Sequence, residues 1–183
     1  PTRRSSDLAA LPLETLAAHG KPGALVLGGA CGGILPWLES RGLAAADYLR
    51  REELCLANAV PSAEGAIQIA MEETARTLHG TAALVIGYGR IGMALAPRLR
   101  GLGMDVTVCA RRCETRALAE MQGFAAVPME QLPAAAKAAP VIFNTVPAPV
   151  FTPAQYDTID PACVLIDLAS APGGIDASQC LRR

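Results

Sequence analysis

The chain has 183 residues, of which 51% are hydrophobic, and it carries a formal net charge of −1 with a pI of about 6.2. A chain so close to neutral has no electrostatic reason to bind nucleic acid, and no apolar run approaches the roughly 20 residues that a membrane helix needs. The first residues also lack the charged and then apolar pattern of a secretory signal. We therefore expect a globular, cytoplasmic protein that binds neither nucleic acid nor a membrane.

The stretch PTRRSSDL at residues 1–8 matches the translation of a common sequencing adaptor. We expect these residues to be an artefact, and the alternative is a polar, disordered leader. The nucleotide record of the gene distinguishes the two. In either case the segment is excluded from the fold prediction.

The six cysteines are scattered along the chain without a C-x-x-C pair. This pattern predicts neither a zinc ribbon nor a dense disulfide framework. Cys109 and Cys113 have a spacing that a metal site can use, but neither of the two histidines lies near them in the sequence. We expect no metal site.

Residues 9–79 are interpreted as part of an amino-terminal substrate domain with a connecting helix. The run ALVLG at 24–28 predicts a strand, followed by a glycine-rich bend, GGACGG, and a helix in ILPWLESRGL. The run ELCLANAVP predicts a second strand, which Pro61 closes. These elements form an α/β unit too small to complete a sheet.

A long helix is predicted from Ser62 to about Leu78. Ser62 is a suitable N-cap, and Glu64 falls in the first turn, where negative charge is favoured. The pair His79–Gly80 is expected to end this helix. The helix connects the amino-terminal part to the rest of the chain.

From Thr81 onward, apolar strands and helices alternate, which predicts a Rossmann-type doubly wound parallel sheet, an α/β fold. We assign residues 80–183 to a dinucleotide-binding domain. The expected strands are 82–87, 104–109, FAAVP, PVIFNTVP and ACVLIDLAS, and the expected helices are 89–101, 113–122, 129–138 and one beginning near Ile175. A six-stranded domain of this kind needs one more strand. We therefore expect the chain to be truncated at both ends.

The stretch ALVIGYGRIGMAL places Gly87, Gly89 and Gly92 in a G-x-G-x-x-G frame between a strand and a helix. In this context the first glycine permits a tight turn, the second lets the backbone approach a pyrophosphate, and the third lets the helix pack near the strand. The N–H groups at the start of the helix favour the phosphates. Arg90 and Ile91 lie within the same predicted cofactor loop. The alternative is a glycine-rich turn without a ligand.

The second predicted strand of this domain, VTVCARRCE, indicates which dinucleotide binds. NAD sites commonly have an acid at this strand end for the ribose 2′-hydroxyl, but no acid occurs here until Glu114. Arg111 and Arg112 stand where a 2′-phosphate arrives, and guanidinium groups suit it in charge and geometry. We favour NADP, with NAD possible. The alternative is that one or both arginines are solvated surface residues.

Two further loops follow the carboxyl ends of predicted strands, where ligands of such sheets bind. In the first loop we predict cofactor contacts by Asn144, Thr145, Val146 and Pro147, with the two polar side chains directed at the nicotinamide ribose or the substrate. In the second loop we predict a contact by Asp167. The alternative for both loops is that the polar residues only form turns, or that Asp167 caps the next segment.

Three stretches carry a resemblance to a known family: NAVPSAEGAIQIAMEET, LHGTAALVIGYGRIGMALAPRL, and VIFNTVPAPV together with VLIDLASAPGG. From about residue 24 to the end, the chain resembles the family of dipicolinate synthase A-subunits of spore-forming bacteria. The resemblance implies a two-domain oxidoreductase similar in design to 2-hydroxy-acid and alanine dehydrogenases. It also implies a flavin-binding partner, the dipicolinate synthase B-subunit, and oxidation of a dihydrodipicolinate precursor to dipicolinic acid during sporulation.

Such an oxidation removes a hydride and a proton from a dihydropyridine ring, so the protein mainly needs to orient the ring and hold two carboxylates. We predict that Asn58 and Ser62, with the free N–H groups of the helix that Ser62 begins, bind one carboxylate. Glu64 is the predicted proton acceptor, the alternative being a partner of the helix dipole. His79 and His19 supply no histidine–acid pair.

Two other functions compete with this one. The first is an NADP-dependent 2-hydroxy-acid or amino-acid dehydrogenase, which needs no flavoprotein partner. The second is a non-catalytic module that senses a dinucleotide. In each case we expect a homo-oligomer.

Overall fold

The computed structural model describes residues 12–21 and 23–180, so the prediction for residues 1–8 lies outside the described residues. The chain divides into two compact units, Pro1–Cys55 and Leu56–Arg183. The division falls within a helix, well before the predicted domain boundary at residues 79 and 80, which stays a prediction of functional organisation.

The first unit contains a pair of parallel strands, β1 and β2, in which Leu25 lies beside Ala44 and Gly28 beside Asp47. The second of these strands was not predicted, because alanines carry little of the β-branched or aromatic signal by which strands are recognised. The elements of this unit are α1 (Leu13–His19), β1 (Leu25–Gly28), α2 (Leu35–Glu39), β2 (Ala44–Asp47) and the short 3-10 helix η2 (Tyr48–Arg50).

Helix α3 extends over Glu52–Glu73. The predicted strand at ELCLANAVP is therefore wrong, and so is the predicted helix start at Ser62. Glu, Leu and Ala are strong helix formers, but Pro61 inside the helix costs about 3 kcal/mol, which the tertiary packing of the helix offsets. A row of buried alanines on the helix, Ala63, Ala66 and Ala70, stabilises it by packing in the core of the second unit.

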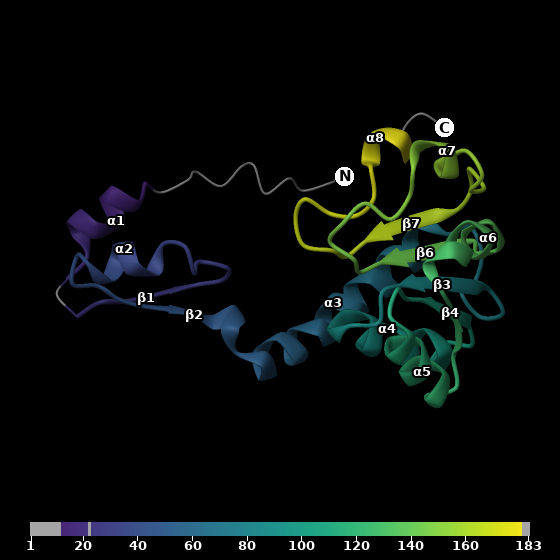
Figure 1. Ribbon diagram of the computed structural model, residues 1–183, viewed down its shortest axis with the longest axis horizontal. Coiled ribbons are helices and arrows are strands. Elements are labelled where there is room, and N and C mark those ends of the chain that lie inside the picture. The colour runs from purple at the N-terminus through teal and green to yellow at the C-terminus, as the bar shows by residue number, and fades with distance from the viewer. Residues whose placement is uncertain (1–11, 22, 181–183) are drawn as a thin grey trace. The chain divides into compact units, whose positions relative to one another are not determined.

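The second unit is built on a five-stranded parallel sheet in the order β5-β4-β3-β6-β7 (Figure 1). This is the 3-2-1-4-5 part of the order found in dinucleotide-binding folds, so the predicted fold class is confirmed. The strands are β3 (Ala82–Ile86), β4 (Asp105–Cys109), β5 (Ala125–Val127), β6 (Val141–Asn144) and β7 (Val164–Asp167).

Helices cover both faces of this sheet (Figure 1). On β3, Val85 packs with α3 and α4 on one face, while Ile86 packs with α6 on the other face. Because all five strands are parallel, their carboxyl ends lie at one edge of the sheet, and ligands of such sheets bind at this edge. The remaining elements are α4 (Arg90–Gly101), α5 (Cys113–Met121), η3 (Met129–Gln131), α6 (Leu132–Ala138), α7 (Pro153–Tyr156) and α8 (Ala177–Cys180).

Candidate functional site: a dinucleotide cleft

The three glycines of the G-x-G-x-x-G frame differ in what a side chain would meet. Gly87 has φ +90°, and a Cβ atom there would collide with Thr145 Oγ1. A Cβ atom at Gly92 would collide with the carbonyl oxygen of Gly87. The first and third glycines are therefore required by the protein itself, for the turn and for close packing of helix on strand.

Gly89 is different, because a Cβ atom there would meet no protein atom within 4 Å. Its backbone is extended (φ −92°, ψ −155°), and as the N-cap of α4 it offers no side-chain acceptor to the first N–H groups of the helix. Nothing in the fold of this unit requires a glycine here. The arrangement fits a pyrophosphate lying on the bare backbone at the start of α4.

Tyr88, between the first two glycines, anchors the loop. The side chain is 5% exposed, its ring lies edge-on to Phe124, and its hydroxyl donates a hydrogen bond to Gln122 Oε1. Burial raises the pKa of Tyr88. Its role depends on residues more than thirty positions away, and the sequence pattern therefore gave no signal for it.

A cavity of about 430 Å³ lies beside the glycine loop, at the carboxyl ends of β3 and β4. Five of the predicted cofactor residues line it: Gly87, Gly89, Arg111, Arg112 and Val146. Thr115, Met129 and residues 148–150 also line it and were not predicted. Met129 follows the end of β5, so the rule that ligands bind at strand ends contained the signal for that residue.

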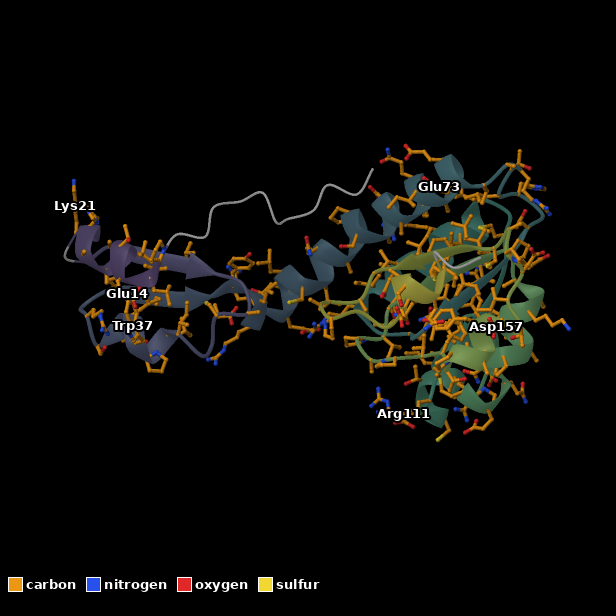
Figure 2. All side chains as sticks on the ribbon, turned by 90° about the horizontal axis from the view of Figure 1, so that it is seen from above. Glu14, Lys21, Trp37, Glu73, Arg111 and Asp157 are labelled. Carbon is orange, nitrogen blue, oxygen red and sulfur yellow. The ribbon has the colours of Figure 1, made fainter. Side chains whose placement is uncertain are left out.

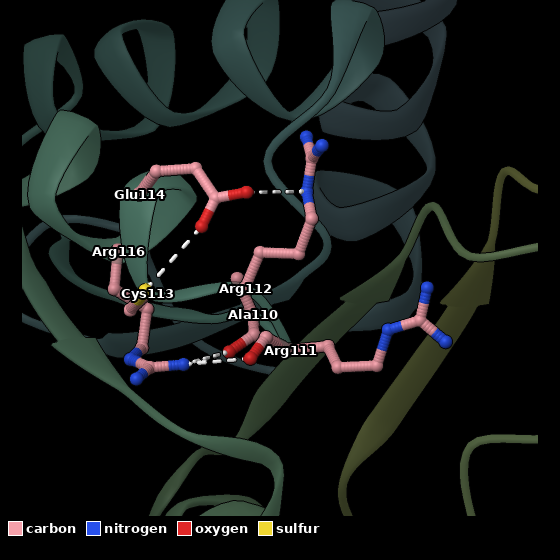
Figure 3. A network of polar contacts seen from close by, with 6 residues as sticks. All are labelled: Ala110, Arg111, Arg112, Cys113, Glu114 and Arg116. Atoms are coloured by element: carbon pink, nitrogen blue, oxygen red, sulfur yellow. Dashed lines mark hydrogen bonds and ion pairs between the residues drawn. The ribbon is translucent and has the colours of Figure 1, made fainter.

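Arg111 and Arg112 have different surroundings (Figure 3). Arg112 Nε lies 3.5 Å from Glu114 Oε1. Hydrogen bonds from its own backbone and from the Cys113 thiol, together with nearby guanidinium groups, hold the pKa of Glu114 below its ordinary value. Within residues 12–21 and 23–180, the side chain of Arg111 has no hydrogen-bond or ion-pair partner, and it extends outward from its unit (Figure 2). Arg111 is therefore the guanidinium left available to a ligand.

Cys109 ends β4 and lines the same cavity with a buried thiol. Burial, followed by the nearby charge of Glu130, raises the pKa of Cys109 to about 11. The sulfur lies 3.7 Å from the carbonyl oxygen of Pro128 and 3.6 Å from Met129 Sδ. At neutral pH this group is a protonated, weakly polar part of the cavity wall.

The polar residues at the ends of β6 and β7 bind each other. Asn144 is fully buried, and its amide nitrogen donates to Asp167 Oδ1 at 2.8 Å and to the carbonyl oxygen of Val146 at 3.0 Å. Its side-chain oxygen accepts from the N–H of Val146. The geometry makes Asn144 an organiser of its own loop, leaving no group of its side chain directed at a ligand.

Asp167 closes the neighbouring loop in the same way. Its carboxylate accepts hydrogen bonds from the N–H groups of Ala169, Gly174 and Ile175. Gly174 lies so close to the β6 loop that a Cβ atom there would collide with the carbonyl oxygen of Val146. The motif DLASAPGG therefore folds its loop against the cavity-lining loop.

The other predicted cofactor residues do not line this cavity. Both the N–H and the hydroxyl of Thr145 donate to the carbonyl oxygen of Ile86, at 2.9 Å each. Ile91 is half-buried on α4, Pro147 is exposed on its loop, and Arg90 is exposed at the first position of α4. Their contacts with a cofactor stay predictions.

The predicted substrate residues lie within α3, away from a helix start. Ser62 Oγ donates to the carbonyl oxygen of Asn58 at 2.9 Å, and a residue inside a helix has its N–H engaged by the preceding turn. The predicted carboxylate site relied on a helix start at Ser62, and that start is wrong. Contacts of Asn58 and Ser62 with a substrate stay predictions. Glu64 Oε1 lies 3.7 Å from Arg98 Nε and lines a separate groove between α3 and α4. Its role as a proton acceptor stays a prediction.

Two features are absent from the part of the chain that the structure describes. It contains no cluster of three or more His, Cys, Asp or Glu side chains that could hold a metal ion. None of its helices combines the length and the apolar character needed to cross a membrane.

Comparisons with known proteins agree with this geometry. Residues 55–161 match the family model described as D-isomer specific 2-hydroxyacid dehydrogenase, NAD binding domain. A curated relative, the dipicolinate synthase A-subunit of Bacillus subtilis strain 168, is 32% identical over 126 residues, which are 69% of this chain and 42% of the relative. The crystal structure of the dipicolinate synthase A-subunit from Bacillus halodurans matches with a TM-score of 0.84 at 27% identity, over 100% of this chain and 62% of that one.

The structure of the A chain of dipicolinate synthase from Bacillus subtilis matches with a TM-score of 0.81 at 25% identity, over 99% of this chain and 61% of that one. The resemblance to the family of dipicolinate synthase A-subunits is thus confirmed. The chain spans less than two thirds of each of these proteins.

Proposed function

We propose that the chain, which belongs to the family of D-isomer specific 2-hydroxyacid dehydrogenase NAD-binding domains, is the cofactor-binding part of a dipicolinate synthase. The observation that carries this proposal is the glycine loop, in which Gly87 and Gly92 are needed by the fold while the space at Gly89 is left open. Similarity to dipicolinate synthase A-subunits in both sequence and structure supports the same activity. We place the protein in the cytoplasm.

Each part of the cavity suits one part of a dinucleotide. The backbone of Gly87–Gly89 and the start of α4 would hold the pyrophosphate. Met129 and the apolar side chains at 148–150 would contact the adenine, with the β4 end beside its ribose. The loops after β6 and β7, fixed by Asn144 and Asp167, would shape the nicotinamide end.

The proposed reaction oxidises a dihydrodipicolinate precursor to dipicolinic acid during sporulation. The ring loses a hydride and a proton and becomes aromatic, and a bound nicotinamide supplies the hydride acceptor. What this chain contributes is orientation, since the fixed loops at the strand ends exclude alternative positions of the ring. We further propose a flavoprotein partner corresponding to the dipicolinate synthase B-subunit, and a homo-oligomeric state.

The proposed cofactor is NADP. No acidic side chain lines the described cavity, so no carboxylate there selects a ribose 2′-hydroxyl. Arg111 lines the same cavity with an uncommitted guanidinium, and the nearby hydroxyl of Thr115 also lacks a hydrogen-bond partner among the described residues. Together they provide a cation and a hydroxyl donor for a 2′-phosphate.

The test is a titration of the chain with NADPH and with NADH, followed by nicotinamide fluorescence. A separate assay combines the chain with NADP⁺, a flavoprotein partner and a dihydrodipicolinate precursor while the absorbance of a pyridine dicarboxylate is recorded, because the oxidised nucleotide is needed to accept the hydride. We expect binding of NADPH by the chain alone and formation of the dicarboxylate in the complete mixture. Absence of any nucleotide binding would contradict the proposed function.

Replacing Arg111 with Met tests whether the site prefers NADP over NAD. We expect the Kd for NADPH to rise at least about tenfold, since a charged hydrogen bond contributes about 1.5–3 kcal/mol, while the Kd for NADH stays within about a factor of two. The fluorescence titrations measure both values. Equal weakening of both cofactors would remove the argument for NADP.

The family match favours a second candidate, a 2-hydroxy-acid dehydrogenase. This enzyme would oxidise a simple 2-hydroxy acid without any flavoprotein. Assays with a panel of such acids distinguish the two, because turnover of one of them in the absence of a partner supports the second candidate and counts against the first.

A further inference from the structure

We propose that Arg116 is a positioning residue for cofactor selectivity, because it fixes the turn from which Arg111 reaches the cavity. This inference rests on the proposed function, in particular on the binding of NADP. Arg116 itself does not line the cavity. It acts, in this proposal, through the backbone of Arg111.

The contacts of Arg116 are made by one nitrogen atom. Its Nη1 donates to the carbonyl oxygen of Ala110 at 2.9 Å and to that of Arg111 at 2.8 Å (Figure 3). Two consecutive peptide groups are thereby tied to one guanidinium on the first turns of α5. A planar guanidinium loses little further freedom when it makes such a pair of bonds, so the tie is stiff.

The same turn is held from the sheet side. The N–H of Ala110 donates to the carbonyl oxygen of Val127 on β5, and the carbonyl oxygen of Cys109 accepts from the N–H of Gly87. The backbone between β4 and α5 is therefore fixed at both ends. Arg111 is the residue in this turn whose side chain is exposed, lines the cavity and is not engaged by the described protein.

Arg112 is adjacent to Arg111, but its guanidinium is less available to a 2′-phosphate. Its guanidinium lies 3.5 Å from the carboxylate of Glu114, which competes with a phosphate for it. Selectivity for a 2′-phosphate then depends mainly on Arg111, and the precision of Arg111 depends on Arg116. Removing Arg116 would let the turn move and would lower the fraction of time that Arg111 spends at the phosphate.

The experiment is a double-mutant cycle with Arg111→Met and Arg116→Met, read out as the ratio of the Kd for NADH to the Kd for NADPH. We expect Arg116→Met to lower this ratio about five- to tenfold by weakening NADPH alone. In the Arg111→Met background, we expect the same replacement to change the ratio less than twofold, because the residue it positions is gone. Arg116→Lys keeps the charge and can donate to the carbonyls but lacks the planar guanidinium, so it should retain more of the ratio than Arg116→Met does.

Arg98→Met is the matched control. Arg98 also donates from Nη1 to a backbone carbonyl oxygen, that of Ala94 at 2.7 Å, but it lies on α4 and outside the lining of the cavity. We expect it to leave the ratio unchanged. Thermal unfolding of each variant verifies that the chain remains folded.

Three results for Arg116→Met would overturn the inference. An unchanged ratio in Arg116→Met would show that the tie does not matter for selectivity. Equal weakening of NADH and NADPH would show a general structural role. An equal loss in the presence and in the absence of Arg111 would show that the charge of Arg116 acts directly on the phosphate. If the parent chain binds no nucleotide, the proposed function fails as well, and if it binds both equally, only the NADP assignment and this inference fail.

Discussion

The carboxyl ends of β3 and β4 and those of β6 and β7 form two halves of one sheet edge, with polar groups arranged in opposite ways. At β3 and β4, the space at Gly89 and the guanidinium of Arg111 are left unused by the described protein. At β6 and β7, the side chains of Asn144 and Asp167 bind each other and five further backbone groups in their two loops.

The difference shows that a polar residue at a strand end has two possible uses. It can meet a ligand, or it can shape the loop that meets the ligand. The two halves look alike in the sequence, because Arg111 lies just after β4 and Asp167 is the last residue of β7, both at the carboxyl end of a parallel strand. We therefore expect mutations in the first half to impair binding while leaving the fold intact, and mutations in the second half to impair the fold.

Gly89→Val tests the first half most severely. A Cβ at this position meets no protein atom within 4 Å, but the side chain would occupy the proposed path of the pyrophosphate, so we expect nucleotide affinity to fall at least about 100-fold, with the stability nearly unchanged. Fluorescence titration and chemical denaturation measure the two effects. Gly101→Val is the control, since an added Cβ at that position of α4 also meets nothing within 4 Å. Retained nucleotide binding in Gly89→Val would show that the glycine loop does not hold the pyrophosphate.

Asp167→Ala tests the second half. Removing the carboxylate leaves Asn144 and three backbone N–H groups without their acceptor, and we expect the free energy of unfolding to fall by about 3 kcal/mol. Asp160→Ala is the matched control, because Asp160 accepts one hydrogen bond from the N–H of Ala162 and should lose under about 1 kcal/mol. Urea denaturation measures both variants. If Asp167→Ala instead loses nucleotide affinity and keeps its full stability, then Asp167 contacts the ligand, and the proposed difference between the two halves is wrong.

A feature of the fold could be predicted from the sequence where neighbouring residues determine it, and could not where distant residues do. The sheet was predictable because buried parallel strands are apolar runs, and Gly87 and Gly92 were predictable because only glycine fits such a turn and such packing. The second strand of the amino-terminal unit and the path of α3 through Pro61 were not, because alanine gives little strand signal and packing overrode the proline.

The candidate site shows the same limit. The partners of Asn144 and Tyr88 lie 23 and 34 positions away, so no local pattern reveals that both side chains are already engaged by the protein. Arg111 and Arg112 look identical in the sequence and differ through Glu114, which the fold turns toward one of them. Which residues are left for a ligand is thus decided by tertiary contacts.

Thr115→Val makes a smaller change in the first half. The hydroxyl of Thr115 lines the cavity and has no hydrogen-bond partner in the part of the chain that the structure describes, so its loss leaves no buried group unsatisfied. We expect NADPH affinity to fall about two- to fivefold, with NADH affinity and stability unchanged. The two cofactor titrations measure this. A loss of stability above about 1 kcal/mol would place Thr115 with the structural residues instead.

Cys109 combines features of ligand-facing and structural residues, since it lines the cavity and also packs in the core. Its pKa is raised to about 11 from an ordinary value of 9.0, chiefly by burial. Between these values the unfolded chain releases the thiol proton while the folded chain keeps it, so this group stabilises the fold fully below pH 9 and loses that contribution as the pH rises toward 11. We therefore expect the stability difference between the parent and Cys109→Ala to shrink from pH 8 to pH 10.5 in urea denaturation.

The thiol of Cys113, the first residue of α5, is exposed and therefore contrasts with the buried thiol of Cys109. Iodoacetamide at pH 8 should modify Cys113 in the folded chain and leave Cys109 unmodified, because alkylation requires an accessible thiolate. Bound NADPH should leave the rate at Cys113 almost unchanged, since Cys113 does not line the cavity. Rapid alkylation of Cys109 in the absence of denaturant would mean that the end of β4 opens to solvent, and the turn carrying Arg111 would then be too loose to hold a phosphate in one place.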